Sequence, residues 1–196
     1  MTKIKVNRVN KTGSNAPTLE LTGTTCIWGQ SESGKSHMAR EMLKAADPKQ
    51  CVIIDPQSPA GYDAPGVRRA LADGKTRIIC NDSRRDHQIG AMVFALNHST
   101  PETPVYVVAD EAPGYMDKPR DILSRMVLQG RHAGFGILII GQRPASVYAE
   151  YRTQAKATYW MRLTDHTDME TAKKSLGPAA EELRGFKQGE YVKWPV

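Results

Sequence analysis

The residues Gly29-Gln30-Ser31-Glu32-Ser33-Gly34-Lys35-Ser36 fit the pattern GxxxxGK[ST], in which a glycine-rich loop joins a strand to a helix. An apolar run at residues 25–28 precedes this loop, and a helical pattern at residues 35–46 follows it. The glycines let successive backbone N–H groups point inward toward phosphate oxygens, and the helix N-terminus adds partial positive charge. The sequence therefore predicts a phosphate-binding loop at residues 29–36.

Two side chains of this loop carry the chemistry expected of a nucleotide site. Lys35 should reach the β- and γ-phosphates, and the Ser36 hydroxyl should ligate Mg²⁺. Glu32 is unusual here, because an acid near phosphates is unfavourable unless it points to solvent or to a basic neighbour. The residues expected to hold the nucleotide are Gly29, Gln30, Ser31, Glu32, Ser33, Gly34, Lys35, Ser36 and His37.

A second motif follows the apolar run at residues 105–109, which leads directly into Asp110 and Glu111. Open α/β sheets bind ligands at the carboxyl ends of their strands, so two acids there suit a nucleotide site. Asp110 is expected to hold Mg²⁺ together with Ser36, and Glu111 to polarise an attacking water. Strand-end acids also serve as plain helix caps, but the upstream phosphate loop favours the functional interpretation.

Short apolar runs alternate with helical patterns along the chain. This alternation predicts an α/β fold with βαβ units and a mainly parallel sheet flanked by helices on both faces. The expected strands are residues 25–28, 51–54, 77–80, 105–109, 136–140 and 157–163, and the expected helices are residues 35–46, 65–72, 86–97 and 119–128, the last with Asp117 as a cap.

Both ends of the chain suggest small additions to this core. Residues 1–23 alternate weakly and predict a short strand or hairpin. After the core, residues 164–175 predict a helix, residues 181–184 a short helical turn, and residues 190–194 a late strand at an edge of the sheet. We expect one domain over residues 1–196, with an N-terminal β segment at 1–23, an ATPase core at 24–163, and a C-terminal helix and edge strand at 164–196.

Composition bounds the class of protein. The chain has 196 residues, and its 27 Lys and Arg against 21 Asp and Glu give a net charge of +6, which permits an acidic partner such as nucleic acid. No run of about 18 apolar residues occurs and the N-terminus lacks a signal-peptide pattern, so we expect a soluble, intracellular protein without a membrane segment. Cys26, Cys51 and Cys80 lie in or beside apolar runs and are expected to be reduced, buried thiols.

A third motif points to a family. Residues 130–144 read GRHAGFGILIIGQRP, a glycine turn that leads into an apolar strand and a Gln-Arg-Pro exit. With the two motifs above, this segment resembles the FtsK/HerA group of P-loop ATPases, as do Asp55-Pro56 and, more weakly, residues 189–192. The resemblance extends over residues 20–194 and implies a RecA-like P-loop NTPase core.

Within this group the chain looks most like the genome-packaging ATPases of membrane-containing, tail-less viruses, which are close to a bare motor core of this length. That resemblance implies an ATP-hydrolysing motor that moves double-stranded DNA into a preformed capsid. It also implies a homohexameric or pentameric ring around the DNA, capsid or portal-vertex partners, and a location in the host cytoplasm or at the virion vertex.

The resemblance assigns roles to three further residues. Gln142 matches the polar sensor that contacts the γ-phosphate and the lytic water, although a strand-end amide can also simply cap backbone groups. Arg131 matches an arginine finger supplied to the neighbouring subunit's nucleotide, and Arg143 is the rival for that role. A surface arginine at a helix end is the plain alternative for Arg131. The expected catalytic set is Glu111, Lys35, Gln142 and Arg131.

The DNA-contacting segment and the exact activity stay open at this point. Candidates for gripping the backbone are the basic residues among the first 19, the basic stretch at residues 66–85, and the loop at residues 112–119, which includes Tyr115 and Lys118. Alternative functions are a HerA- or FtsK-like DNA translocase or helicase not tied to packaging, a filament-assembly or secretion ATPase, a small-molecule kinase, and a nucleotide-dependent scaffold that does not hydrolyse ATP.

Overall fold

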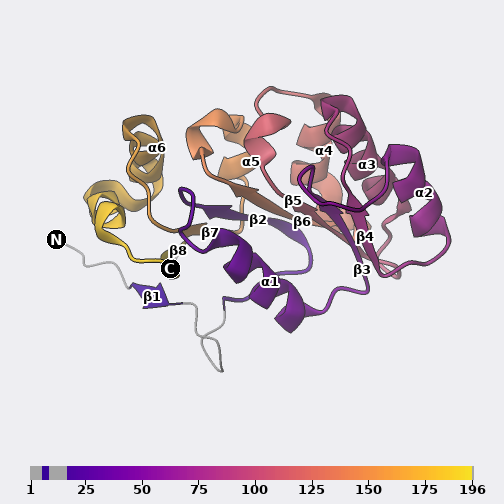
Figure 1. Cartoon of the computed structure of the whole chain (residues 1–196), viewed down its shortest axis with the longest axis horizontal. Coiled ribbons are helices and arrows are strands. Elements are labelled where there is room, and N and C mark those ends of the chain that lie inside the picture. Colours follow the sequence, from indigo (N-terminus) through magenta and orange to yellow (C-terminus); the bar gives the residue numbers. More distant parts are fainter. Residues whose placement is uncertain (1–5, 9–16, 196) are drawn as a thin grey trace.

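The computed structural model describes residues 6–8 and 17–195. Its centre is a single sheet in the order β1-β8-β7-β2-β6-β5-β3-β4 (Figure 1). Expectations that fall on residues 1–5 and 9–16 lie outside the described residues. The strands are β1 (Asn7–Arg8), β2 (Gly23–Trp28), β3 (Gln50–Ile54), β4 (Arg77–Cys80), β5 (Val105–Ala109), β6 (Gly136–Gly141), β7 (Ala157–Trp160) and β8 (Glu190–Trp194).

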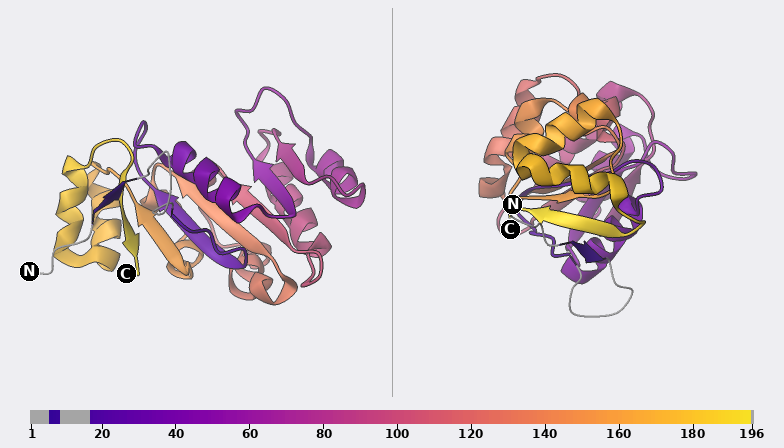
Figure 2. Two further views of the ribbon diagram at one scale, coloured as in Figure 1. Left: turned by 90° about the horizontal axis from the view of Figure 1, so that it is seen from below. Right: turned by 90° about the vertical axis from the view of Figure 1, so that its left-hand side faces the viewer.

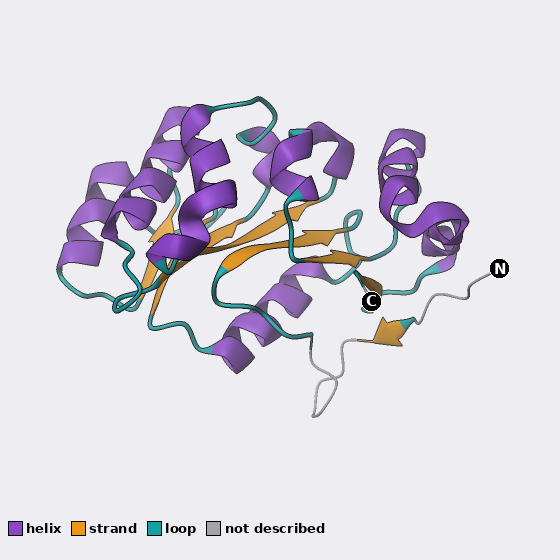
Figure 3. Cartoon of the chain, turned by 180° about the vertical axis from the view of Figure 1, so that it is seen from behind, coloured by secondary structure: helices purple, strands orange, loops and turns teal. Residues whose placement is uncertain are grey.

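Helices cover both faces of the sheet, as the alternating pattern predicts, but unequally. The helix α1 lies on one face, and the others lie on the opposite face (Figure 3). The α-helices are α1 (Lys35–Ala46), α2 (Ala64–Ala72), α3 (Arg85–His98), α4 (Asp121–Gln129), α5 (Ala149–Thr153) and α6 (His166–Leu176), and the 3₁₀ helices are η1 (Ala112–Gly114), η2 (Gly130–Ala133), η3 (Pro144–Ser146) and η4 (Gly177–Gly185).

The pairing of the strands fixes where the motifs meet. The strand β2 pairs in parallel with β6 on one side and with β7 on the other, while β6 pairs in parallel with β5. The strands β5, β3 and β4 continue the parallel part of the sheet. All six carboxyl ends therefore lie at one edge, and β6 separates the strand before the phosphate loop from the strand before Asp110.

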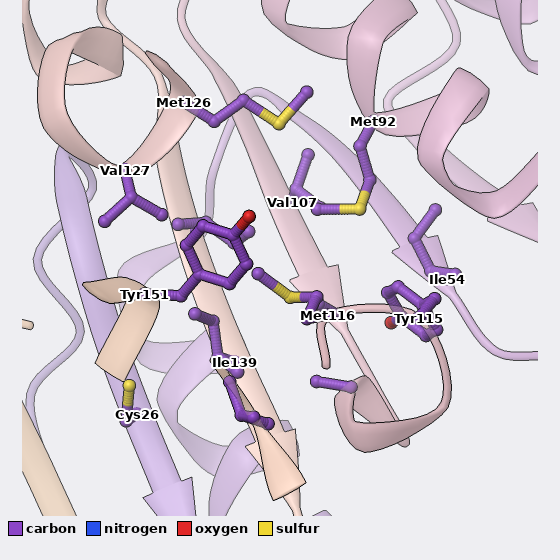
Figure 4. Close-up of a cluster of buried hydrophobic side chains, with 14 of the residues drawn as sticks. Cys26, Ile54, Met92, Val107, Tyr115, Met116, Met126, Val127, Ile139 and Tyr151 are labelled. Carbon is purple, nitrogen blue, oxygen red and sulfur yellow. The ribbon is translucent and has the colours of Figure 1, made fainter. Parts of the chain in front are cut away.

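The larger core lies between the sheet and the helices α2 to α6. Figure 4 shows part of it, with Val107 and Ile139 of the sheet facing Met126 and Tyr151 of the helices. The second core is smaller and packs Met38 and Met42 of α1 against the other face. All three cysteines are free and buried, as expected, and burial raises the pKa of Cys51 to about 12.

The C-terminal strand differs from its expected place. The strand β8 pairs antiparallel with β7, but β1 also pairs antiparallel with its free side, so β8 is not at the edge of the sheet. Beyond these strands, α6 and η4 lie together at one end of the molecule, far from α2 (Figure 2). The small β additions expected at both ends of the core are therefore present and join each other.

Two local predictions were wrong. Asp117 does not cap α4, because that helix begins four residues later and the carboxylate of Asp117 pairs instead with the guanidinium of Arg85. The run at residues 157–163 is a strand only as far as Trp160, because the carbonyl of Arg162 turns to accept a hydrogen bond from Gln30 N–H. No helix in the described part of the chain is long and apolar enough to cross a bilayer.

Candidate nucleotide-binding site

The loop between β2 and α1 has the backbone shape of a phosphate cradle. Gly34 has φ of 103°, a left-handed conformation that glycine adopts without steric cost. A Cβ atom at Gly29 would lie 2.6 Å from the Ser33 hydroxyl, so the tight curl of the loop also needs glycine there. Glu32 has φ of 60° and is exposed, which keeps its charge in solvent and explains how an acid is tolerated in this loop.

Backbone hydrogen bonds hold this loop from three neighbouring segments. Gly29 N–H donates to the carbonyl of Gly141 at 3.3 Å, at the end of β6. Gln30 N–H donates to the carbonyl of Arg162 at 2.8 Å, just beyond β7. From the C-terminal part of the chain, Gly189 N–H donates to the carbonyl of Ser33 at 2.9 Å. The C-terminal segment therefore helps to hold the phosphate loop in place.

Lys35 is buried at the start of α1, with 8% of its surface exposed. Its Nζ donates to the carbonyl of Gln30 at 2.8 Å, and this hydrogen bond joins the end of the loop to its beginning. Burial lowers the pKa of Lys35, and the negative charges of Glu111 and Asp110 oppose that shift. The lysine therefore lies in the field of both acids. Ser36 is exposed in the same first helical turn, and His37 follows it half-buried.

The two acids after β5 occupy different environments. Burial raises the pKa of Asp110, and the nearby charges of Glu111 and Asp55 add to the rise. Its Oδ1 accepts a hydrogen bond from Glu111 N–H at 3.0 Å, and Tyr115 Oη donates to its backbone carbonyl at 2.8 Å. Glu111 has φ of 51°, a left-handed backbone conformation uncommon for a non-glycine residue. Such strain is typical of residues whose side chain must be aimed.

Gln142 meets Glu111 at this edge. The Gln142 Nε2 donates to Glu111 Oε1 at 3.1 Å, from the end of β6 to the end of β5. The strand β6 pairs directly with β5, so Gln142 and Glu111 follow adjacent strands. The sheet therefore places Gln142 between the phosphate loop and the acid that we expected to activate water.

The structure does not bring Arg131 to this edge. Arg131 is exposed in η2, before the amino end of β6, whereas the phosphate loop follows the carboxyl end of the parallel strand β2. The length of a six-residue strand, about 20 Å, separates the two ends of the sheet. Arg131 therefore lies at the opposite edge of the sheet from the phosphate loop of its own chain.

Arg143 lies at the carboxyl edge of the sheet, near the phosphate loop, but two carboxylates already bind its side chain. Its Nε donates to Asp168 Oδ2 at 2.6 Å, and a terminal nitrogen lies 3.3 Å from Asp165 Oδ1. Asp168 is buried, with 1% of its surface exposed, and its other oxygen accepts a hydrogen bond from Ala145 N–H at 3.0 Å. Arg143 thus ties the exit of β6 to α6.

The basic stretch at residues 66–85 divides into two parts. Arg84 pairs with Asp82, and Arg85 pairs with Asp117, so these two cations are neutralised locally. Arg68, Arg69, Lys75 and Arg77 are exposed around α2 and the start of β4. In the loop at 112–119, Tyr115 is buried while Lys118 is exposed.

Oxygen donors suited to Mg²⁺ come from two elements here. Ser36 opens α1, and the Asp110 carboxylate lies close enough to Lys35 to shift its pKa. Hydroxyl and carboxylate oxygens are the ligands that Mg²⁺ prefers when phosphates complete its shell. Within residues 6–8 and 17–195, no group of three or more His, Cys, Asp or Glu forms a metal cluster. The donor set fits a metal held jointly with phosphate, not an all-protein cage.

Sequence reasoning missed two residues that contact the loop. Arg162 lies in a stretch that looked like the end of a strand, and Gly189 lies in a C-terminal segment expected to be peripheral. The available signal was the position of Arg162, two residues after the strand at 157–160. Residues that follow strands of a parallel sheet gather at the same edge.

No protein-family model and no curated protein matches the sequence. The structure is similar to the genome packaging NTPase B204 from Sulfolobus turreted icosahedral virus 2 in complex with sulfate, with a TM-score of 0.76 and 19% identity, over 90% of this chain and 92% of that chain. The same protein in complex with ATP-gammaS gives a TM-score of 0.73 at 19% identity, over 90% and 93% of the two chains.

A further likeness is to the pCW3 conjugation coupling protein TcpA with ATPgS, with a TM-score of 0.57 and 18% identity. It covers 88% of this chain but 59% of that one. At such identities these likenesses show a shared fold. The α/β fold expected from the sequence is confirmed, and it is shared with the genome packaging NTPase B204 and the coupling protein TcpA.

Proposed function

We propose that this chain is an ATP-hydrolysing motor that translocates double-stranded DNA and packages a viral genome into a preformed capsid. The observation that carries the proposal is the hydrogen bond between Gln142 and Glu111, beside Lys35 at one edge of the sheet. A binding-only scaffold has no need of a second acid held by a sensor amide. The whole chain acts as one ATPase domain in this proposal.

The chemistry assigned to the site is hydrolysis of the terminal phosphate. The loop backbone and Lys35 bind the polyphosphate, which draws Lys35 away from the carbonyl of Gln30. Glu111 accepts a proton from water as the water attacks, and Gln142 orients that water. Ser36 and Asp110 would hold Mg²⁺, which would supply positive charge to the phosphate oxygens. The products are ADP and phosphate.

The position of Arg131 supports an oligomer. This arginine lies at the opposite edge of the sheet from the phosphate loop of its own chain, so in this proposal it serves the nucleotide of a neighbouring copy. An arginine supplied in this way stabilises the transition state of phosphoryl transfer. We propose a ring of six or five subunits, with Arg131 as the arginine finger. Arg143 is the poorer candidate, because two carboxylates already hold it.

The net charge of +6 and the exposed basic residues around α2 and β4 support a DNA partner. Contacts to the phosphate backbone are independent of sequence and weaken with salt. The likeness to a genome packaging NTPase supports the same partner. Capsid or portal-vertex proteins are the further partners, and the host cytoplasm and virion vertex are the locations, that follow from this proposal.

A second candidate is a DNA translocase that is not tied to packaging. The likeness to a conjugation coupling protein favours it. Binding to procapsids distinguishes the two, because only a packaging motor docks on them.

The proposal is tested by ATP hydrolysis with and without long duplex DNA, measured as phosphate release on assembled oligomers. We expect duplex DNA to stimulate hydrolysis several-fold and high salt to remove the stimulation. An equal rate of hydrolysis with and without duplex DNA would contradict a DNA motor and favour an ATPase that acts on proteins. Phosphate transfer to a small-molecule acceptor in place of water would identify a kinase.

A further inference from the structure

Arg162 lies two residues beyond the end of β7, against the phosphate loop. Its backbone carbonyl accepts a hydrogen bond from Gln30 N–H at 2.8 Å. The Gln30 side-chain amide fits its neighbours when its nitrogen donates to the Thr164 hydroxyl at 2.9 Å. Its oxygen then accepts from Arg162 Nε at 2.9 Å and from a terminal guanidinium nitrogen at 3.1 Å. The neutral side-chain amide of Gln30, in the phosphate loop, thus holds the guanidinium of Arg162.

This arginine lacks the partner that a half-buried cation usually has. Across the described parts of the chain, no carboxylate lies within ion-pair distance of Arg162. The nearby Arg143, by contrast, is held by two carboxylates. A guanidinium prefers a bidentate anionic partner, and a neutral amide is a weaker one. The Gln30 amide can therefore be displaced by an anion that enters the loop.

The order of the strands says which end of a nucleotide Arg162 can reach. Glu111 and Gln142 lie on one side of β2, at the ends of β5 and β6. Arg162 lies on the other side, at the end of β7. A nucleotide whose terminal phosphate meets Glu111 and Gln142 must turn its opposite end toward β7. The phosphate nearest to Arg162 is then the α-phosphate, next to the ribose.

We propose that Arg162 binds the α-phosphate of the nucleotide held by its own subunit, after release from Gln30. This inference rests on the proposed nucleotide site and adds a residue to it. Arg162 is a binding residue in this role and not a transition-state group, because the bond that breaks lies at the other end of the polyphosphate. Its contribution should be shared by every nucleotide that carries an α-phosphate.

The test measures nucleotide affinity and turnover separately in Arg162→Gln, with Arg125→Gln as a surface control that removes the same charge from the exposed side of α4. We expect Arg162→Gln to raise the Kd of AMP, ADP and ATP alike, by about 10- to 100-fold. The kcat at saturating ATP should stay within about threefold, and Arg162→Lys should recover part of the affinity. Arg125→Gln should bind all three nucleotides as the wild type does.

Gln30→Ala separates binding from a purely structural role. If Arg162 binds phosphate, removal of the competing amide should leave the guanidinium free and lower the Kd of ADP by about two- to fivefold. If Arg162 merely braces the loop through Gln30, both substitutions should weaken binding equally, which would overturn the inference. A loss confined to ATP would also overturn it, since Arg162 would then act at the terminal phosphate. A wild-type protein that binds no nucleotide would refute the proposed function itself.

Discussion

The side chain of Gln142 donates a hydrogen bond to the carboxylate of Glu111 across 3.1 Å, from one strand end to the next. This contact fixes the orientation of the carboxylate, whose backbone is itself in a left-handed conformation with φ of 51°. A general base must be aimed before it can accept a proton from a bound water. Substitutions of Glu111 and of Gln142 are therefore expected to slow hydrolysis to different extents.

Glu111→Gln should bind ATP with near wild-type affinity but hydrolyse it at least about 10³-fold more slowly. The reason is that the substitution keeps the shape of the side chain and removes the group that accepts the proton. Phosphate release and equilibrium ATP binding measure the two effects. Lys35→Ala is the contrasting variant, because it should lose binding itself. Normal turnover by Glu111→Gln would remove this residue from the mechanism.

Gln142→Ala should lower kcat by about 10- to 100-fold and change the Kd of ATP by less than about threefold. The carboxylate of Glu111 remains but loses the donor that aims it. The measurement is steady-state hydrolysis with nucleotide binding as a control. The double variant with Glu111→Gln should be no slower than Glu111→Gln alone, since the two act as a unit. Additive losses would show that Gln142 acts independently of Glu111.

Asp110 gives a prediction about pH. Because burial raises its pKa, its carboxylate takes up a proton at a higher pH than an ordinary aspartate. A protonated Asp110 is a poor ligand for Mg²⁺, so Mg²⁺-dependent hydrolysis should fall on the acid side above the usual aspartate range of about 3.9. The profile of kcat/KM against pH tests this. Mg²⁺-free ADP binding, which does not need this carboxylate, provides the baseline.

The raised pKa of Asp110 also predicts how the stability of the protein depends on pH. A carboxyl whose folded-state pKa is raised binds its proton more tightly in the folded than in the unfolded chain. Ionised Asp110 therefore destabilises the nucleotide-free protein above that pKa, and the penalty disappears as the pH falls through it. Asp110→Asn should raise the thermal midpoint at neutral pH while removing Mg²⁺-dependent hydrolysis. A lower midpoint at neutral pH would contradict this assignment.

The clamp between Arg143 and Asp168 should behave as a structural feature. Asp168→Ala leaves Ala145 N–H without its acceptor and removes the closer of the two carboxylates that hold Arg143, at a cost of about 1–3 kcal/mol in unfolding free energy. Urea unfolding measures that cost. Arg143→Ala should likewise destabilise the chain but keep hydrolysis within about tenfold. If Arg143→Ala abolished hydrolysis in a stable, assembled protein, Arg143 would replace Arg131 as the finger.

Arg131 can be tested by mixing subunits. Arg131→Ala and Glu111→Gln proteins should each be inactive, but mixed rings should recover part of the activity. In a mixed ring some sites combine an intact Glu111 with an intact Arg131 from the neighbouring copy. Phosphate release at varied mixing ratios measures the recovery. Persistent inactivity in rings shown to be mixed would exclude a finger supplied in trans.

Much of the fold could be predicted from local patterns. The strand at 105–109 and the helix at 35–46 match the structure to the residue, because apolar runs and glycine or proline boundaries mark them clearly. Asp117 failed as a cap, since its carboxylate is taken by Arg85, 32 residues away. Such long-range partners leave no local signal.

From the sequence, only the site residues that belong to a recognisable motif could be predicted. The loop at 29–36 and the acids after β5 have recognisable spacing, and the structure places them at one edge of the sheet. Arg162 contacts the same loop but belongs to no such motif, and the weak resemblance at residues 189–192 does not predict that Gly189 contacts the loop. Their placement follows from the pairing of β7 with β2 and of β8 with β7, which periodicity does not specify.

The central claim is that ATP hydrolysis moves this protein along duplex DNA. Displacement of a third strand from a triplex placed far from the loading end measures such movement directly. The wild-type protein should displace the strand with ATP, after a lag that grows with distance, and Glu111→Gln should not. Strand displacement that needs no hydrolysis, or none by assembled wild-type rings that hydrolyse ATP on the same DNA, would contradict the claim.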